Sequence, residues 1–196
     1  MSNEYVMEMA TRTYPEPLEY TLIEKLTNSS SPISRQEAAS ECKDHMVAGI
    51  DTTGDGLCFL MYELSKPENQ RSQTKLREEL RQHKASSPSF SKETQQLTQL
   101  AYLDAVIKEI LRLAPPIPMS LPRSVPAGGR TIDGYFIPQH TIVSCQPYSV
   151  HRMNADVFPN PDSFNPERWL EEKGSAERDR LFFAFATGGR GCTGRK

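Results

Sequence analysis

The chain has 196 residues, enough for one domain with a buried core, and a formal net charge of −2 at pH 7. This balance, with 8% aromatic residues, argues against a basic nucleic-acid-binding surface and against a polybasic membrane arm. No apolar run is long enough to span a membrane, and the polar first residues do not form a signal peptide. The four cysteines show neither a CxxC pair nor the spacing of a zinc site.

The first half of the sequence is typical of helices. Apolar spacing predicts a short amphipathic helix over about 17–27, with a proline near its start. Ser34 and Glu37 then form a capping-box pattern, which predicts a long helix running to Leu64, just before Pro67. A helix of roughly thirty residues rises about 45 Å, long enough to cross a whole domain.

The middle of this long helix contains Ala48-Gly-Ile-Asp-Thr-Thr-Gly54, a run that is poor in helix-forming residues. Each glycine costs about 1 kcal/mol relative to alanine in a helix interior. One interpretation is a widened turn that frees a carbonyl and a threonine hydroxyl to face a ligand. The other is a regular helix that tolerates close packing at Gly49 and Gly54. Both interpretations fit the residues.

Two further helices are predicted, over about 68–84 and about 99–113, and two consecutive prolines stop the second. Glu109 and Arg112 lie on one face of the second helix, away from its apolar stripe. As a surface ion pair they would stabilise the fold by at most about 1 kcal/mol. A buried pair would need a further partner, and Arg168 could supply it.

After residue 115 the pattern changes to strands and irregular chain. Short strands are predicted within 131–138 and 141–145. Residues 151–170 are rich in Pro, Asn and Asp without a clear period, and so long an irregular stretch is usually functional or tightly held. We expect a fold that is mainly α with small β-sheets (α+β). It forms one domain, made of a leading helix and loop (1–33), a helical part (34–114) and a part with strands and irregular chain (115–196).

The C-terminal residues Phe185-Ala-Thr-Gly-Gly-Arg-Gly-Cys-Thr-Gly194 form a glycine-rich segment with a single cysteine. Glycines allow the backbone to turn sharply and to pass close to a flat cofactor. The planar fork of Arg190 suits a carboxylate such as a haem propionate, and Cys192 could give the haem iron a thiolate ligand. An ordinary glycine-rich turn is the alternative.

Three motifs, in this order, resemble the signatures of the cytochrome P450 family. They are A-G-x-D-T-T at Ala48–Thr53, E-x-x-R at Glu109–Arg112 with P-E-R-W at Pro166–Trp169, and F-x-x-G-x-R-x-C-x-G at Phe185–Gly194. The resemblance extends from about Tyr14 to Lys196, and two stretches of it are similar to filamentous-fungal members. It implies a partial P450 fold, from the long central helix to the haem-ligand loop.

The resemblance also implies a role for each matching residue. Cys192 would be the metal ligand, at the axial position of the haem iron. Asp51 and Thr52 would be catalytic and deliver protons during oxygen activation. The other cofactor-binding residues would be Ala48, Gly49, Arg123, Phe185, Gly188, Arg190 and Gly194, with the two arginines on the propionates. Glu109, Arg112 and Arg168 would form a structural triad that holds the irregular stretch.

The chemistry implied is that of a haem-thiolate monooxygenase. The cofactor would be haem b (iron protoporphyrin IX), and electrons would come from NADPH through NADPH–cytochrome P450 reductase. One oxygen atom would enter a C–H bond of a small organic substrate, in fungal secondary metabolism. The family's place is the cytosolic face of the endoplasmic-reticulum membrane, whereas this chain, expressed as it stands without an anchor, would be cytoplasmic.

The sequence departs from the family in length, since members are commonly more than twice as long. The N-terminal half and the helix that follows the ligand loop have no counterpart, so we expect a fragment of a longer monooxygenase. A truncated, inactive remnant without stable haem is the alternative. A third hypothesis keeps the haem-thiolate site for isomerase or dehydratase chemistry. The Asp51–Thr52 pair argues against it, because those reactions need no proton relay to dioxygen.

Overall fold

The computed structural model describes residues 4, 8, 21–27, 33–86 and 97–195. These residues belong to two compact units, Met1–Gly54 and Asp55–Lys196. Whether the chain forms the single domain expected from its sequence stays a prediction.

Helix α3 (Arg35–Ser65) begins in the first unit with the capping box that the sequence predicts. The Glu37 amide donates to Ser34 Oγ at 3.2 Å, and the Ser34 amide donates to Glu37 Oε2 at 2.8 Å. These two bonds satisfy amides that have no partner inside the helix. The shorter α2 (Leu22–Thr27) matches the end of the helix expected over 17–27, whose residues 17–20 lie outside the described part.

In the second unit, α3 is followed by a short 3₁₀ turn, η1 (Pro67–Asn69), and by α4 (Gln70–Ser86). Pro67 ends α3 because its ring clashes with a continuing helix. The buried Asn69 side chain fixes the corner by donating from Nδ2 to the Glu63 carbonyl at 2.9 Å. The helix expected over about 68–84 is therefore confirmed, after one turn of 3₁₀ geometry.

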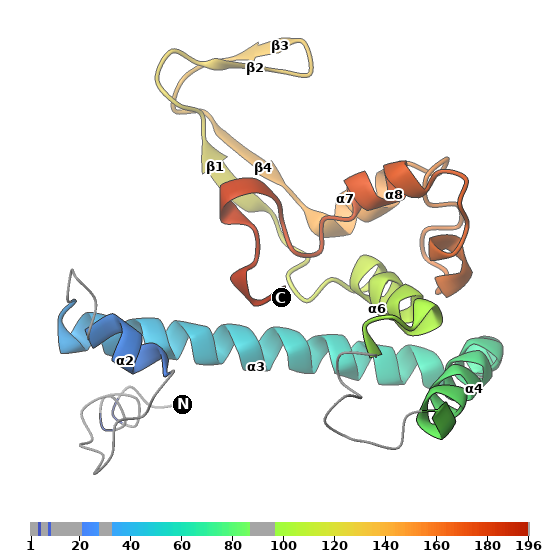
Figure 1. Ribbon diagram of the computed structural model, residues 1–196. Coiled ribbons are helices and arrows are strands. Elements are labelled where there is room, and N and C mark those ends of the chain that lie inside the picture. The colour runs from blue at the N-terminus through green and yellow to red at the C-terminus, as the bar shows by residue number, and fades with distance from the viewer. Residues whose placement is uncertain (1–3, 5–7, 9–20, 28–32, 87–96, 196) are drawn as a thin grey trace. The chain divides into compact units, whose positions relative to one another are not determined.

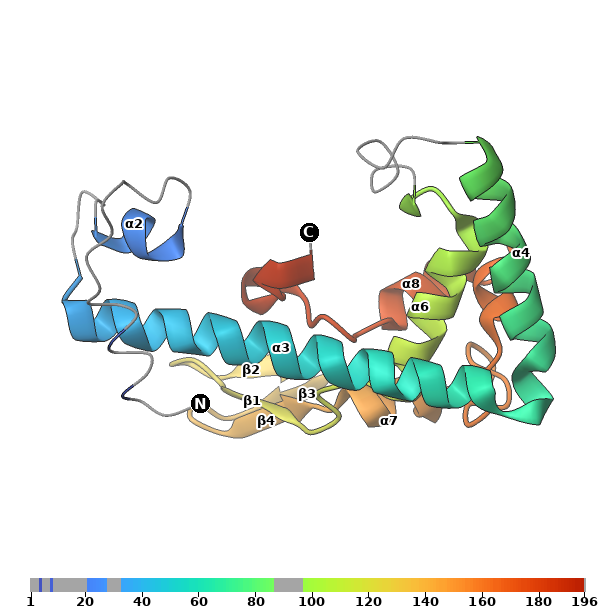
Figure 2. The same cartoon turned by 90° about the horizontal axis from the view of Figure 1, so that it is seen from below.

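Helix α6 (Ala101–Leu113) lies beside α4 (Figure 2). Both oxygens of Glu79, on α4, accept backbone N–H groups at the start of α6, from Tyr102 and Leu103, each at 2.9 Å. The buried side of α6 combines apolar and charged residues: Tyr102, Ala105, Val106, Glu109, Ile110 and Arg112. The expectation that the charged pair lies away from the apolar stripe is wrong, since the pair shares the buried face while Ile107 is 42% exposed.

Two small antiparallel sheets form a ribbon in this unit (Figure 1). One sheet pairs β1 (Leu121–Ser124) with β4 (Ile142–Cys145), and the other pairs β2 (Arg130–Ile132) with β3 (Tyr135–Ile137). Asp133 and Gly134 both have positive φ, which suits the two-residue turn of a tight hairpin. The strand expected within 141–145 is confirmed as β4, whereas the segment 131–138 forms the hairpin of β2 and β3. Strand β1 was not expected, because it contains Pro122, which is uncommon inside a strand.

The remaining chain alternates short helices with irregular segments: α7 (Pro147–Met153), η2 (Pro166–Trp169), α8 (Ser175–Leu181), η3 (Gly188–Arg190) and η4 (Thr193–Arg195). The fold is mainly α with small antiparallel sheets, as expected. Among the described helices, none combines the length and the apolar character needed to cross a membrane.

Candidate functional site

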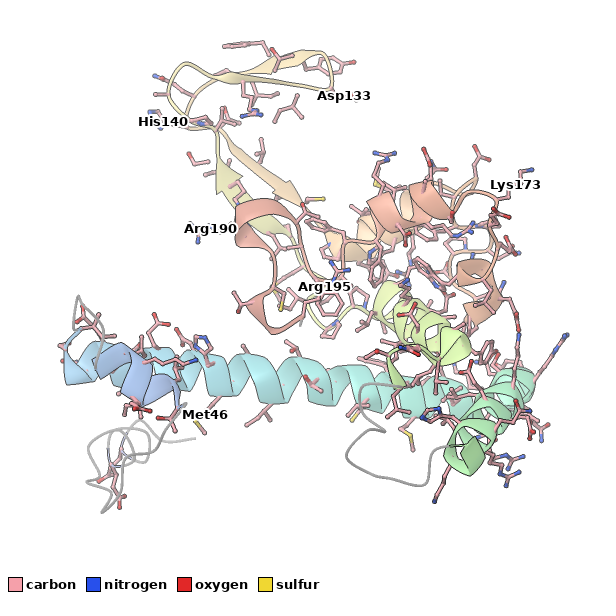
Figure 3. The ribbon with its side chains drawn as sticks, viewed as in Figure 1. Met46, Asp133, His140, Lys173, Arg190 and Arg195 are labelled. Atoms are coloured by element: carbon pink, nitrogen blue, oxygen red, sulfur yellow. The ribbon has the colours of Figure 1, made fainter. Side chains whose placement is uncertain are left out.

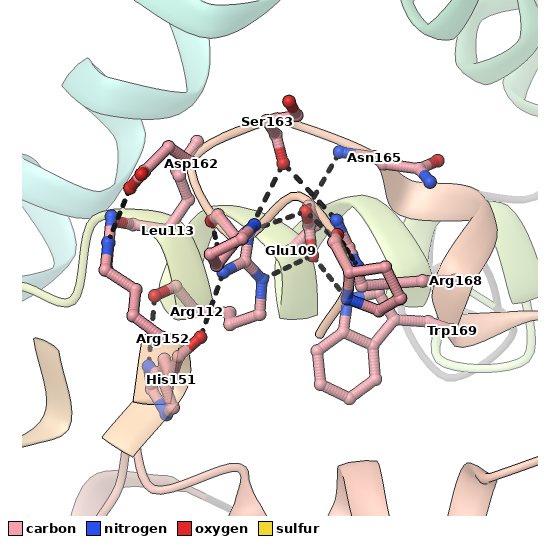
Figure 4. A network of polar contacts seen from close by, with 12 residues as sticks. Glu109, Arg112, Leu113, His151, Arg152, Asp162, Ser163, Asn165, Arg168 and Trp169 are labelled. Carbon is pink, nitrogen blue, oxygen red and sulfur yellow. Dashed lines mark hydrogen bonds and ion pairs between the residues drawn. The ribbon is translucent and has the colours of Figure 1, made fainter. Parts of the chain in front are cut away.

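The carboxylate of Glu109 is the centre of a buried polar network in the second unit (Figure 4). Its side chain is fully buried and accepts five hydrogen bonds from four residues. Arg112 donates two of them, from Nε to Oε2 and from Nη2 to Oε1, each at 2.9 Å. Arg168 Nε adds a third at 3.1 Å. Of the two arrangements considered for Glu109 and Arg112, the structure has the buried one, with Arg168 as the further partner.

The two guanidinium groups of this network also hold the irregular chain around them. Arg112 donates to the carbonyls of Pro161 (2.7 Å) and Ser163 (3.2 Å), and Arg168 donates to the carbonyl of Pro159 (2.9 Å). Because residues 159–163 form no ladder with a neighbouring strand, these donors supply the partners that their backbone lacks. The irregular stretch expected from sequence is thus tightly held by two buried side chains.

This network has one carboxylate for two guanidinium groups. Burial lowers the pKa of Arg168, while the nearby Glu109 carboxylate opposes that shift. An arginine still keeps its charge at neutral pH. The network therefore depends on Glu109 and on the backbone carbonyls to compensate two buried positive charges.

His151 is a buried residue of the same region that the sequence did not single out. Its Nδ1 lies 3.0 Å from the Arg112 carbonyl, and its Nε2 accepts the Phe183 N–H at 2.9 Å. Burial lowers the pKa of His151 to about 4, and the charges of Arg112 and Arg152 add to this shift. The imidazole is therefore neutral at pH 7. A histidine in a Pro- and Asn-rich segment gives no signal in the sequence that it will be buried.

An aromatic cluster continues from His151 toward the C-terminal loop. The Phe182 ring stacks on the imidazole, with the centroids 5.8 Å apart and the planes at 16°. Phe182 also meets Trp169 edge to face at 5.3 Å and Phe185 at 6.3 Å. Such contacts stabilise by about 0.5–1.5 kcal/mol each beyond the area they bury. The cluster connects the polar network with the first residue of the cysteine loop.

The cysteine loop, residues 185–192, is closed by its own backbone. The Cys192 N–H donates to the Phe185 carbonyl at 2.8 Å, and the Gly191 N–H donates to the Gly188 carbonyl at 3.0 Å. Gly188 has a φ of +66°, a left-handed conformation that glycine adopts without a steric cost. The Cys192 side chain is exposed and its thiol is free. The loop thus presents a thiol from a fixed turn.

The residues of the second unit fit a haem by the chemistry of their donors. The Cys192 thiol is free and exposed, and a cysteine sulfur is a known ligand of haem iron. Arg190 and Arg123 are both exposed, and neither forms an ion pair within the described ranges, so both can pair with carboxylates (Figure 3 labels Arg190). Phe185 is half-buried under the guanidinium of Arg195, 5.4 Å from its centroid, a contact absent from the sequence interpretation.

The residues expected to be catalytic, Asp51 and Thr52, belong to the first unit. Helix α3 is a regular α-helix through them, so the widened turn proposed from sequence is wrong. The Thr52 hydroxyl donates to the Ala48 carbonyl at 2.6 Å, a bond to the preceding turn that an α-helix permits. Within the first unit, a Cβ placed on Gly49 or Gly54 would meet no described atom within 4 Å, so neither glycine is closely packed there.

Comparison with known proteins agrees with the motifs. The family model described as Cytochrome P450 matches residues 6–196. The chain is 36% identical over 177 residues to cytochrome P450 monooxygenase ankB of Aspergillus thermomutatus, an alignment that covers 89% of the chain and 32% of that protein. It is 41% identical over 149 residues to a pisatin demethylase of Fusarium vanettenii, with 76% of the chain and 28% of that protein covered. The chain spans about a third of the length of these curated relatives, and it belongs to the cytochrome P450 family.

Proposed function

We propose that the chain carries the haem-binding part of a haem-thiolate monooxygenase. The observation that supports this most is the free, exposed thiol of Cys192 on a loop closed by the 2.8 Å bond to Phe185. A buried cysteine of a folded core would not be available to a metal. The aromatic cluster connects this loop with the fully buried Glu109 network, which would hold the start of the loop in place.

In this proposal each donor of the second unit holds one part of haem b. Cys192, as a thiolate, binds the iron, and nearby backbone N–H groups of the loop stabilise its negative charge. Arg190 and Arg123 pair with the propionates, for which their planar forks are suited. Gly188 and Gly194 keep the loop free of side chains next to the cofactor. Bound haem would supply the activation of dioxygen for insertion into a C–H bond.

We propose that Asp51 and Thr52 of α3 deliver protons during oxygen activation, because of the chemistry of their side chains. The Asp51 side chain is exposed and can exchange protons with water. The Thr52 hydroxyl donates to Ala48, which leaves both its lone pairs able to accept a hydrogen bond. The pair could therefore hold and pass a proton, with Ala48 and Gly49 providing small surfaces beside it. Two electrons, delivered one at a time from NADPH through a reductase at the endoplasmic-reticulum surface, complete the proposal.

For the substrate we propose a small organic molecule. The relatives come from fungi, and one of them is named a pisatin demethylase, which supports a small organic molecule as the substrate.

The test is a carbon-monoxide difference spectrum of the reduced chain after haem has been supplied. A thiolate-ligated complex gives the long-wavelength Soret band, which we expect for the wild type and not for Cys192→Ser. Cys145→Ser, at another exposed cysteine, is the matched control and should keep the band. A wild type without the band, or a Cys192→Ser variant that retains it, would contradict the proposal.

The proton-handling role has its own test in preparations that turn over with a reductase. Thr52→Ala should lower the amount of product formed per NADPH consumed, whereas Thr52→Ser keeps the hydroxyl and should stay near the wild-type ratio. An unchanged ratio in Thr52→Ala would show that the hydroxyl takes no part.

A further inference from the structure

We propose that His151 is a positioning residue for the cysteine ligand: it fixes the start of the Cys192 loop to the Glu109 network. This inference rests on the proposed function, because it assigns to His151 the placement of the thiolate. The segment that it fixes, residues 182–192, leads from the end of α8 directly into the loop.

The hydrogen bonds of the imidazole define which nitrogen carries its proton. A backbone N–H can only donate, so the 2.9 Å bond from Phe183 requires a lone pair on Nε2. The proton of the neutral ring is then on Nδ1, where it is donated to the Arg112 carbonyl at 3.0 Å. Neither an imidazolium nor the other tautomer can form both bonds. His151 is thus a two-ended connector between α6 and the chain after α8.

The α6 end of this connector is held twice. The ring of His151 donates to the Arg112 carbonyl, and the His151 carbonyl accepts from Arg112 Nη1 at 3.3 Å. Arg112 is itself fully buried and bonded to Glu109. The imidazole is fully buried, and Phe182 stacks on one of its faces at 16°. The ring therefore has a fixed position from which to hold Phe183.

The other end of the connector continues to the cysteine through backbone bonds. Phe183, whose N–H is held by His151, accepts the Ala186 N–H with its carbonyl at 3.2 Å. Phe185, the next residue but one, accepts the Cys192 N–H at 2.8 Å. The hydrogen-bonded route from the Glu109 network to Cys192 thus consists of His151 and one short, internally bonded stretch of chain, beside the aromatic contacts of Trp169, Phe182 and Phe185. Loss of the Phe183 bond would let the base of the loop move.

Two substitutions separate the ends of the connector. In Gln the side-chain oxygen can take the place of Nε2 and accept from Phe183, while the bond to Arg112 is lost. In Asn the amide nitrogen can take the place of Nδ1 and donate to Arg112, while the Phe183 N–H is left without an acceptor. His140→Asn is the control, because His140 is exposed and has a φ of +64°, a conformation that asparagine tolerates.

The experiment measures amide hydrogen exchange of the full chain and, in parallel, its ferrous carbon-monoxide spectrum after haem is supplied. In His151→Asn we expect exchange at residues 183–192 to be faster by about tenfold or more, as one buried N–H loses its acceptor. At equal haem content the long-wavelength band should also give way to the shorter-wavelength form. His151→Gln and the His140→Asn control should retain both the slow exchange and the band. Unchanged exchange in His151→Asn, or equal loss in His151→Gln, would overturn the inference.

The two proposals can fail separately. A wild-type chain without a thiolate band would remove the haem-thiolate function, and the exchange data would then decide alone whether His151 fixes the loop. If His151→Asn does not fold, the nitrogen-15 spectrum of the wild-type imidazole gives the answer without a variant. A neutral ring protonated on Nδ1 supports the connector, and protonation on Nε2 overturns it.

Discussion

Trp169 and Glu109 lie 60 positions apart in the sequence, and the indole Nε1 of Trp169 donates a 2.9 Å hydrogen bond to Glu109 Oε2. On the other carboxylate oxygen, Asn165 donates its backbone N–H, also at 2.9 Å. The 3₁₀ turn η2, which carries Trp169 and Arg168, is therefore attached to α6 by one charged and one neutral donor in addition to its packing. A single carboxylate on α6 fixes the position of the whole turn.

Substitution of Glu109 tests this dependence most directly. Glu109→Gln keeps the size of the side chain but removes the charge, leaving the buried Arg112 and Arg168 without a carboxylate. Breaking a buried pair in this way costs about 3–5 kcal/mol. We expect a large fall in the urea midpoint of unfolding. Asp104→Asn, which removes an exposed partner of Lys108 on the same helix, should change the free energy of unfolding by less than about 1 kcal/mol.

The Trp169 indole offers a smaller and more selective change. Trp169→Phe removes the donor to Glu109 Oε2, but an aromatic ring remains beside Phe182 and Phe158. Hydrogen bonds to charged groups contribute about 1.5–3 kcal/mol, so a destabilisation of that size is expected, plus a cost for the smaller ring. In combination with Glu109→Gln the loss should be smaller than the sum of the two. Strict additivity in this double-mutant cycle would show that the indole acts independently of the carboxylate.

Sequence reasoning predicted the elements whose causes are local. The Ser34–Glu37 capping box is formed by residues three positions apart, and the end of α3 follows from Pro67. The Asp133-Gly134 turn, which divides the strand segment 131–138 into β2 and β3, also has a local cause but was not singled out from the sequence. The strand β1 could not be predicted in this way, because its pairing partner β4 lies some twenty residues further along the chain.

For the candidate site the sequence suggested a partner for Glu109 and Arg112 but could not show that they are buried. Their burial depends on residues 151–169, whose backbone carbonyls accept hydrogen bonds from the two guanidinium groups. His151 was missed for the same reason. Its ring bonds to the backbone groups of Arg112 and Phe183, and because every residue has such groups, the sequence cannot indicate which of them will be partners. At Thr52 the sequence suggested a distortion that the structure does not have. The residues around Thr52 have weak helix propensities, but α3 is a regular helix there.

The contact between α4 and α6 gives a third prediction. Glu79 accepts the N–H groups of Tyr102 and Leu103, and so takes the place of an N-cap side chain for a helix whose own N-cap, Leu100, cannot provide one. Glu79→Ala should destabilise the second unit by about 1–2 kcal/mol, as for the loss of an N-cap. Glu78→Ala, one residue earlier on α4, is the control, because Glu78 accepts a surface hydrogen bond from Gln82 and caps no helix among the described residues. Equal effects of the two would show that the capping bonds do not matter.

The capping box of α3 gives a fourth prediction. Hydrogen bonds from Ser34 lower the pKa of Glu37 from its ordinary value of 4.5. A carboxyl with a lowered pKa stabilises the fold above its ordinary pKa, and this contribution is lost as the pH falls through the lowered value. Ser34→Ala should therefore speed amide exchange in the first turn of α3 at pH 7. At a pH low enough to protonate Glu37, the variant and the wild type should differ less. Ser40→Ala, in the same helix, is the control.

The titration of His151 gives a fifth prediction, on the pH dependence of stability. Its pKa is about 4 in the folded chain and 6.5 in the unfolded one, because burial disfavours the charged ring. Between these values the unfolded state binds more protons, so stability falls as the pH falls. The contribution is fully present above pH 6.5, decreases down to about pH 4 and is constant below. Its total is about 3 kcal/mol.

His151→Gln isolates this contribution, since glutamine does not titrate and can still accept the Phe183 N–H. The variant loses the bond to the Arg112 carbonyl and should be less stable than the wild type at pH 7. Acidification from pH 7 to pH 4.5 should then destabilise the wild type more than the variant, so the two free energies of unfolding converge. Urea titrations at several pH values would measure this difference. Parallel curves would mean that folding does not lower the pKa of His151, which would contradict a ring held neutral by its two hydrogen bonds.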